Sequence, residues 1–295
     1  MKRILIVGSG DVAMRAIPWL AKRFRVYAVT RSPTACAALR SRGAIPLLAD
    51  LDDRRSLARL AGIADTVLHF APPPGAGLQD PRTAWLLAAL AQRPSLPQRV
   101  IYISTTGVYG DCGGAWVGEA SRCAPRTDRA RRRVDAERRL RRFGRRCAVA
   151  VSILRAPGIY AADRLPLARL QRGEPVLLAE QDVHTHHIHA DDLAQLACVA
   201  IFRGRPGRVY NAVDDTSMKM GDYFDFAADF FGVPRPPRMS RDDIAAALSP
   251  MALSFMSESR RLSNERIRRE LRVRLKYPTV REGFAAARND RGGNI

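Results

Sequence analysis

Long apolar runs are missing from this chain of 295 residues. No segment approaches the roughly 20 consecutive apolar residues that a membrane-spanning helix needs. Lys2 and Arg3 precede an apolar run, but that run stops after about four residues, which is shorter than the apolar core of a secretory signal. We therefore expect neither a membrane partner nor a signal peptide.

Cysteine is also scarce. The five cysteines include no Cys-x-x-Cys pair and leave an odd one over; they are Cys36, Cys112, Cys123, Cys147 and Cys198. A scattered set of this kind argues against a disulfide framework and against a zinc site, and it is typical of a reducing compartment. We expect a cytoplasmic protein that holds no metal.

Carboxylates are few beside the cations. The chain has 49 Lys and Arg against 29 Asp and Glu, which gives a net charge of +20, and nearly all of its cations are arginine. They concentrate between Arg122 and Arg146, and such a face either binds an anionic partner, such as nucleic acid, or is solvated. The segment lacks interleaved aromatics, and Val134, Leu140 and Phe143 give it an apolar side to bury. We expect a solvated helix face and no specific nucleic-acid partner.

What the chain does have is a glycine motif near its start. Residues 4–13 read ILIVGSGDVA, an apolar run that suits a buried parallel strand and breaks into Gly8-x-Gly10-x-x-Ala13. Gly8 would permit a tight turn, Gly10 would let a pyrophosphate approach the helix N-terminus, and Ala13 would let helix and strand pack closely. Pro18 falls inside this helix and should kink or shorten it. The candidate cofactor contacts in the loop are Gly8, Ser9, Gly10, Asp11 and Val12.

The next apolar run indicates which dinucleotide binds. Residues 25–30 (RVYAVT) end in Arg31 and Ser32, where an NAD-binding protein usually carries a carboxylate that accepts hydrogen bonds from the ribose 2′-hydroxyl. An arginine there suits the 2′-phosphate of NADP, although a solvated arginine at a strand end is the alternative. We expect a preference for NADP over NAD.

Strand and helix patterns then alternate. Further apolar runs lie at 44–48, 66–71, 100–104 and 148–154, and helical patterns lie at 33–42, 56–61, 83–93 and 128–143, with two later ones near 221–231 and 264–271. Such alternation predicts right-handed crossovers and a doubly wound parallel sheet, a Rossmann α/β fold. We expect a dinucleotide-binding domain over 1–155 with a return segment at about 188–213. A smaller, partly discontinuous substrate region would comprise 156–187 and 214–295.

Ordered motifs carry a family resemblance. They read Ile103-Ser104-Thr105-Thr106-Gly107-Val108-Tyr109-Gly110, then Glu119 and Pro125, then Arg155-Ala156-Pro157-Gly158-Ile159-Tyr160, then Ile188-His189-Ala190-Asp191-Asp192-Leu193-Ala194. Over essentially the whole chain this order resembles the extended short-chain dehydrogenase/reductases, the epimerase/dehydratase group. The resemblance makes Thr105 the residue that hydrogen-bonds the substrate oxygen. It also implies cofactor contacts from Asp50 and Leu51 at the adenine, Ala71 and Pro72 at the ribose and pyrophosphate, Pro157 and Gly158 at the nicotinamide, and Ser104 beside Thr105.

The chain departs from this family at its catalytic pair. The family's Tyr-x-x-x-Lys, in which the tyrosine is the general acid/base, falls at Arg129 and Arg133, followed by Glu137. An arginine keeps its proton at physiological pH, so Arg129 cannot shuttle one, whereas Arg133 can still donate to ribose hydroxyls as a cofactor contact. The chain resembles an atypical branch that keeps the dinucleotide fold without the standard pair.

Other side chains are candidates for the missing acid/base. Tyr109 and Tyr160 are the nearest phenols by motif position, although Tyr109 alternatively packs under its loop. In the run His184-Thr185-His186-His187-Ile188-His189, a strand would split the histidines between two faces, which argues against a metal site. The resemblance makes His189 structural.

The sequence therefore predicts an NADP-preferring oxidoreductase or epimerase-like enzyme. It would act on a carbonyl or sugar-like small molecule, as a monomer or homodimer, with Thr105 and Tyr109 as catalytic candidates. The alternative is a non-enzymatic NADP-binding regulator or sensor, which the absence of the Tyr/Lys pair favours. A nucleic-acid-binding protein that uses the arginine-rich helix is a third hypothesis.

Overall fold

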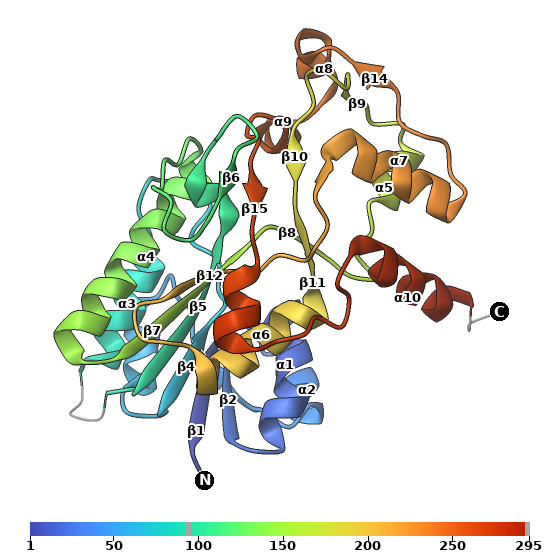
Figure 1. Ribbon diagram of the computed structural model, residues 1–295. Coiled ribbons are helices and arrows are strands. Elements are labelled where there is room, and N and C mark those ends of the chain that lie inside the picture. The colour runs from blue at the N-terminus through green and yellow to red at the C-terminus, as the bar shows by residue number, and fades with distance from the viewer. Residues whose placement is uncertain (93–95, 293–295) are drawn as a thin grey trace.

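The computed structural model describes residues 1–92 and 96–292, and its centre is a seven-stranded parallel sheet (Figure 1). Its strands lie in the order β12 (Val209–Asn211), β7 (Ala150–Ala156), β5 (Arg99–Thr105), β4 (Thr66–His69), β1 (Arg3–Val7), β2 (Arg25–Thr30) and β3 (Ile45–Leu48). After β3 the chain returns to the other side of β1 to form β4, so the strand order reverses there. Ligands of such sheets bind in the crevice at the carboxyl end of this reversal. The predicted Rossmann fold is confirmed.

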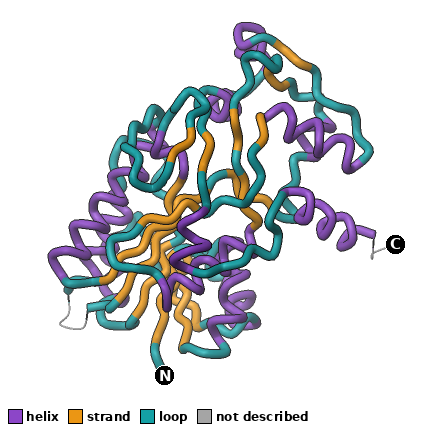
Figure 2. Tube along the Cα trace, viewed as in Figure 1, coloured by secondary structure: helices purple, strands orange, loops and turns teal. Residues whose placement is uncertain are grey.

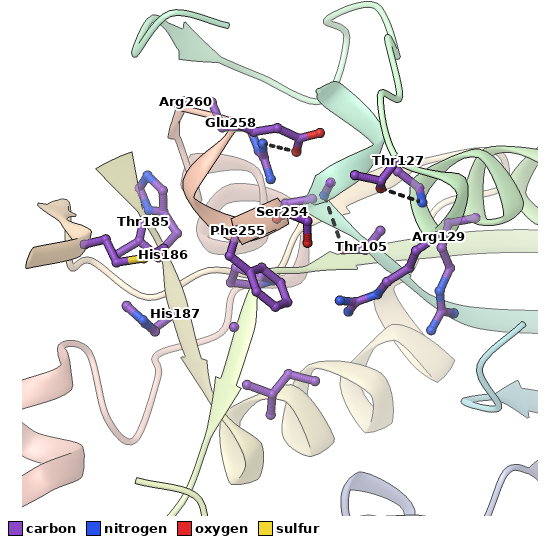
Figure 3. Close-up of a pocket in the computed structure, with 18 of the residues that line it drawn as sticks. Thr105, Thr127, Arg129, Thr185, His186, His187, Ser254, Phe255, Glu258 and Arg260 are labelled. Atoms are coloured by element: carbon purple, nitrogen blue, oxygen red, sulfur yellow. Dashed lines mark hydrogen bonds and ion pairs between the residues drawn. The ribbon is translucent and has the colours of Figure 1, made fainter. Parts of the chain in front are cut away.

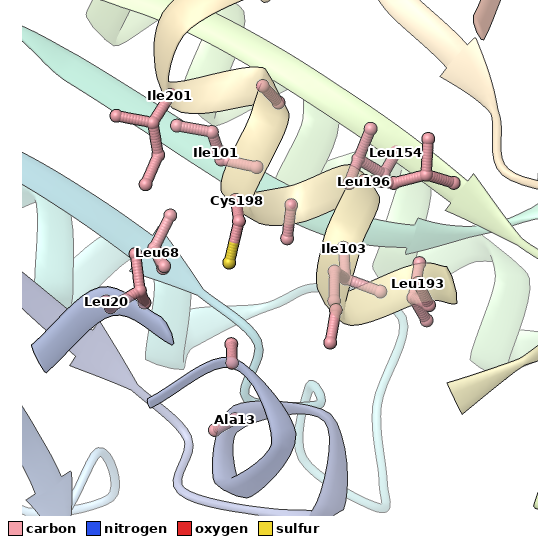
Figure 4. Close-up of a cluster of buried hydrophobic side chains, with 14 of the residues drawn as sticks. Ala13, Leu20, Leu68, Ile101, Ile103, Leu154, Leu193, Leu196, Cys198 and Ile201 are labelled. Carbon is pink, nitrogen blue, oxygen red and sulfur yellow. The ribbon is translucent and has the colours of Figure 1, made fainter. Parts of the chain in front are cut away.

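Helices cover both faces of the sheet because its strands are apolar on both sides. One face is covered by α1 (Asp11–Ala21), α2 (Ala35–Ser41) and α6 (Ala190–Arg203), and the other by η1 (Arg54–Leu60), α3 (Pro81–Leu90) and α4 (Asp128–Cys147). Figure 4 shows Leu193 and Leu196 of α6 next to Ile103 and Leu154 of the sheet, and Ala13 of α1 belongs to the same buried cluster. Among the described helices, none combines the length and apolar character that crossing a membrane requires.

Pro18 does not shorten its helix as predicted. Helix α1 continues past it to Ala21. A proline at this position cannot donate to the carbonyl four residues earlier, which belongs to Met14. The Arg42 guanidinium donates to that carbonyl over 3.1 Å, so a distant side chain replaces the lost main-chain donor.

Several element boundaries also differ from the predictions. Ala148, predicted as strand, adopts φ 52° as the left-handed C-cap of α4, so the strand begins at Ala150. The 56–61 helix is 3₁₀, and the 264–271 helix is a π-helical segment, η3 (Ile267–Leu271). Arg93, the predicted end of the third helix, lies outside the described residues, as do the last three residues of the expected C-terminal region.

Short strands and helices form a second layer beyond the carboxyl ends of the sheet strands (Figures 1 and 2). Four two-stranded pairs lie there: β8 (Gly158–Tyr160) with β11 (His187–His189), β9 (Val176–Leu177) with β14 (Arg238–Met239), β10 (His184–Thr185) with β13 (Met218–Lys219), and β6 (Trp116–Val117) with β15 (Arg261–Leu262). The remaining helical segments are η2 (Thr106–Tyr109), α5 (Leu167–Gln171), α7 (Met220–Phe231), α8 (Arg241–Ala247), α9 (Pro250–Met256) and α10 (Val280–Gly292). A separate apolar core centred on Tyr223, Phe224 and Phe284 holds this layer together.

Candidate functional site

The glycine motif forms the turn from β1 into α1. Gly8 has φ 98°, and a Cβ placed on it would lie 2.4 Å from the Ala71 main-chain nitrogen, so no larger residue fits. Gly10 is the N-cap of α1, and a Cβ there would meet nothing within 4 Å. The first glycine is therefore required by the fold, whereas the second leaves open space at a helix N-terminus, where unpaired N–H groups favour an anion.

Two polar side chains in this loop bind other parts of the protein. The Ser9 hydroxyl donates to the Val29 carbonyl over 2.7 Å, which ties the loop to the end of β2. The Asp11 carboxylate pairs with Arg15 at 2.9 Å and with Arg164, which lies in the second layer. These arginines neutralise a carboxylate that would otherwise repel a phosphate at this helix N-terminus.

The residues expected beside the adenosine lie at the ends of β2 and β3. Arg31 is exposed directly after β2, and Ser32 is half-buried beside it. Asp50 follows β3, where its carboxylate accepts the Asp52 amide over 3.0 Å. Arg82, and more weakly Arg31, hold the pKa of the Asp52 carboxyl below its usual value. The exposed Arg31 side chain is therefore accessible to a solvent-side ligand such as a phosphate.

A cavity of about 1070 Å³ lies between the sheet and the second layer (Figure 3). Its lining combines the loop after β4, the end of β5, the start of α4, the turn before β8, the histidine run and α9. Of the predicted site residues it includes Pro72, Thr105, Arg133, Pro157 and Gly158. The structure therefore brings together the residues expected at the nicotinamide and the substrate oxygen, although Thr105 and Pro157 are 52 positions apart in sequence.

Thr105 ends β5 at the wall of this cavity. It is the N-cap of η2, where its hydroxyl oxygen accepts the Gly107 amide over 3.2 Å. That bond leaves the hydroxyl hydrogen available to a ligand oxygen. Ser104, the other candidate here, is only 3% exposed and donates its hydroxyl to Glu137 over 2.7 Å, away from the cavity.

The two phenols proposed as acid/base candidates are absent from the cavity lining. Tyr109 is 1% exposed, and its hydroxyl donates to Asn211 Oδ1 over 2.7 Å. Burial raises its pKa above the ordinary value. Tyr160 is also buried, and its hydroxyl donates to the Thr279 carbonyl over 3.3 Å. This geometry favours the packing alternative for Tyr109 over a catalytic role.

The first two turns of α4 supply arginines to the cavity wall. Arg133 donates to the Ile103 carbonyl over 2.7 Å and to the Tyr102 hydroxyl over 2.9 Å, so its position is fixed against β5. The Arg129 guanidinium lies 5.5 Å from the centre of the Phe255 ring. In Figure 3, Phe255 projects into the cavity between His187 and Arg129.

Histidines form the opposite wall. The run breaks into β10 and β11 at His186, and as a result His184, His186 and His187 all line the cavity. Burial lowers the pKa of His186 to about 4 and that of His187 to about 3, so both are uncharged near neutral pH. The described residues contain no group of three or more His, Cys, Asp or Glu that could hold a metal ion.

Sequence reasoning missed several lining residues. Arg132, Phe255, Glu258 and Arg260 all contribute to the wall. Arg132 belonged to a run interpreted as a solvated face. The others lie in the irregular C-terminal half, where no motif marked them.

A buried ion pair supports the site from below. Arg155 on β7 is 1% exposed and Glu137 on α4 is 3% exposed. The guanidinium contacts the two carboxylate oxygens at 2.7 and 3.0 Å, a bidentate geometry. Because Ser104 donates to the same carboxylate, α4, β5 and β7 are joined directly beneath Thr105.

The sequence matches a known protein family whose fold agrees with the site described above. Residues 10–212 match the sequence profile of the NAD dependent epimerase/dehydratase family. The chain belongs to this family. The match confirms the resemblance that the ordered motifs indicated.

Solved structures share the epimerase/dehydratase fold over the whole chain. A protein of unknown function from Silicibacter pomeroyi is 34% identical, with a TM-score of 0.83 over 98% of this chain and 99% of that one. The UDP-glucose 4-epimerase of Thermotoga maritima, solved with UDP-glucose, is 16% identical, with a TM-score of 0.79 over 99% and 100%. DesIV, a dTDP-glucose 4,6-dehydratase from Streptomyces venezuelae solved with NAD and TYD, is 20% identical, with a TM-score of 0.78 over 99% and 98%. No curated protein matches the sequence.

Proposed function

We propose that this epimerase/dehydratase family member is a nicotinamide-dependent oxidoreductase or epimerase-like enzyme that prefers NADP and acts on a carbonyl or sugar-like small molecule. The observation that carries the proposal is a single cavity that joins Thr105 to Pro157 and Gly158, at the sheet edge where the Gly8–Gly10 turn leaves space for a pyrophosphate. Fold relatives solved with NAD, one of them also with UDP-glucose, support it. A cytoplasmic location is part of the proposal, in keeping with five free cysteines.

The chain's own residues have distinct roles in this scheme. A bound nicotinamide would supply or accept a hydride. Thr105 donates its hydroxyl hydrogen to the substrate oxygen and stabilises negative charge there. Arg133, held against β5 by two hydrogen bonds, has further N–H groups with which to contact the nicotinamide ribose. Pro157 and Gly158 shape the wall against which the nicotinamide packs.

A second candidate function is a dinucleotide-binding sensor without catalysis. One observation favours it: burial lowers the pKa values of the cavity-lining His186 and His187 to about 4 and about 3, and it raises the pKa of the lining Tyr223 above its ordinary value. None of these groups exchanges a proton readily near neutral pH. The two functions differ in whether hydride transfer follows cofactor binding.

The cofactor preference is tested by calorimetric titration with NADPH and NADH. A charge-assisted contact to the 2′-phosphate contributes about 1.5–3 kcal/mol, so we expect NADPH to bind at least roughly tenfold more tightly. Arg31→Ala should remove this difference and leave NADH affinity unchanged. The control is Arg40→Ala, an exposed arginine on α2 that makes the same charge change. Equal affinities for the two cofactors in the unmodified protein would contradict the preference.

The reaction is tested with a panel of aldehydes, ketones and keto-sugars. For any substrate that turns over, Thr105→Ala should lower kcat by about 10²–10³, because it removes a hydrogen bond to the developing oxyanion. Thr105→Ser should retain most of the rate. Tyr109→Phe should leave kcat close to that of the unmodified protein, since its hydroxyl faces Asn211 and not the cavity. If NADPH binds but no compound accepts or yields hydride, the sensor function replaces the enzyme.

A further inference from the structure

Three arginines of α4 face the cavity without a carboxylate partner. Arg129, Arg132 and Arg133 are spaced i, i+3 and i+4, so their side chains lie on one helix face. All three line the cavity. Among the residues that the structure describes, none of them forms an ion pair with an acidic side chain.

Arg132 is the most confined of the three. It is only 8% exposed, and its guanidinium donates to the Gly77 carbonyl over 2.6 Å. A nearly buried cation without a counterion is costly, because its hydration is lost and no opposite charge replaces it. Partial burial and the neighbouring charges of Arg133 and Arg132 also lower the pKa of Arg129.

Elsewhere the same helix supplies carboxylates to its arginines. The pairs are Arg131 with Asp128, Arg138 and Arg139 with Asp135, and Arg141 with Glu137. The other two arginines of the cavity are neutralised as well, Arg169 by Glu174 and Arg260 by Glu258. Among the described residues that line the cavity, arginines without an acidic partner are therefore found on α4 alone.

The phosphates of a dinucleotide do not account for this charge. A pyrophosphate is expected at Gly8 and Gly10, and a 2′-phosphate at Arg31. None of these three residues lines the cavity; Pro72, also expected near the pyrophosphate, does line it, but it belongs to the loop after β4 and not to α4. The missing anion therefore belongs to the second ligand, the substrate.

We propose that Arg129 and Arg132, beside the ribose-contacting Arg133, form an oxyanion subsite that binds a carboxylate or phosphate group of the substrate. The subsite rests on the proposed function, because it assumes that the cavity binds a substrate. It lies close to the substrate-oxygen contact, since a Cβ on Gly107 would lie 3.6 Å from Thr105 Oγ1 and 3.9 Å from Ala130 Cβ. The preferred substrate is thus a carbonyl or sugar-like acid whose acidic group lies within a few bonds of the reacting carbon.

The test compares three probes that share one sugar ring: glucose, glucuronate and glucose 6-phosphate. Their binding to the protein without dinucleotide is measured by thermal shift and calorimetry at matched ionic strength. We expect the acidic probes to raise Tm and glucose to have no effect. The acidic probe that binds more tightly identifies the recognised group as a carboxylate or a phosphate.

Variants then locate the binding. Arg129→Gln and Arg132→Gln should each lower the affinity for the acidic probe at least roughly tenfold, as expected for loss of one charge-assisted contact. Arg142→Gln, an exposed arginine of the same helix outside the cavity lining, is the matched control and should bind as before. If Arg132→Gln does not fold, Arg129→Gln alone carries the test, because its side chain is exposed to the cavity.

Two results would overturn the subsite: acidic probes that bind no better than glucose, or equal weakening by Arg142→Gln and Arg129→Gln. Because these titrations contain no dinucleotide, they also separate the two proposals. Loss of NADPH binding with intact anion binding refutes the proposed function alone. NADPH-dependent turnover without anion discrimination refutes the subsite alone.

Discussion

The buried pair between Arg155 and Glu137 gives the sharpest stability prediction. Glu137→Gln removes the negative charge and leaves the guanidinium of Arg155, which is 1% exposed, without a counterion. Removing one partner of a buried pair costs about 3–5 kcal/mol. The glutamine amide oxygen still accepts a hydrogen bond. We therefore expect the unfolding free energy to fall by about 3 kcal/mol in Glu137→Gln and by about 5 kcal/mol in Glu137→Ala.

Replacing both partners should recover most of this loss. In the double variant Glu137→Leu/Arg155→Met no uncompensated charge remains, and apolar substitution of a whole buried pair is often neutral. The hydrogen bond from Ser104 and the contact of Arg155 with the Tyr109 ring, at 4.7 Å, are still lost. We therefore expect the double variant to be more stable than Glu137→Gln but slightly less stable than the unmodified protein.

Urea unfolding measures these differences. Coincident transitions in far-UV circular dichroism and tryptophan fluorescence would justify two-state free energies of unfolding. Asp229→Asn, which breaks an exposed pair with Arg235, is the control and should leave the midpoint unchanged. A loss of unfolding free energy below about 1 kcal/mol for Glu137→Gln, or a double variant no more stable than Glu137→Gln, would refute the reasoning.

Two further predictions follow from the site. His187→Phe keeps the ring stacked on Tyr223 and removes a group whose pKa burial lowers from 6.5 to about 3. As the pH falls below 6.5, the histidine is protonated in the unfolded chain before it is protonated in the folded protein. The unfolding free energy of the unmodified protein therefore falls by up to about 1.4 kcal/mol per pH unit. In the variant it should decline less steeply between about pH 6 and 4. An equal slope in both proteins would show that His187 is not held neutral. Gly8→Ala should lower Tm, because its Cβ would lie 2.4 Å from the Ala71 nitrogen, whereas Gly10→Ala should leave Tm unchanged and weaken NADPH binding in calorimetry. Unchanged NADPH affinity in Gly10→Ala would place the pyrophosphate elsewhere.

The sequence predicted the elements of the sheet because their signals are local. An apolar run such as residues 4–7 needs no distant information to be assigned as a buried strand, and alternating helices then determine a parallel sheet. The glycine turn and Thr105 at the end of β5 were likewise found from short motifs. Boundaries were less certain where one residue changed conformation, as at Ala148.

The hydrogen-bond partners of individual side chains could not be predicted, because these partners lie far away in the sequence. The Tyr109 hydroxyl reaches Asn211, which is 102 residues away, and no local pattern shows that this acceptor is present. The Met14 carbonyl, left without its main-chain donor by Pro18, likewise accepts from Arg42, which is 28 residues away. Neither partner of Tyr109 and Met14 could be identified from the residues around a catalytic motif or a proline in a helix.

The directions in which the histidine run and the arginine run face were mispredicted for a related reason. A continuous strand would have placed His186 and His187 on opposite faces, but the break at His186 directs both toward the cavity. Apart from Arg129 and Arg133, which the resemblance placed at the family's catalytic pair, the arginines of α4 were interpreted as one solvated face. A helix of 20 residues, however, presents several faces to different surroundings. Its outer arginines meet solvent or carboxylates, whereas Arg129, Arg132 and Arg133 line the cavity with no acidic partner among the described residues. Composition alone makes these arginines equivalent, and only the fold separates those that meet solvent or a carboxylate from those that line the cavity.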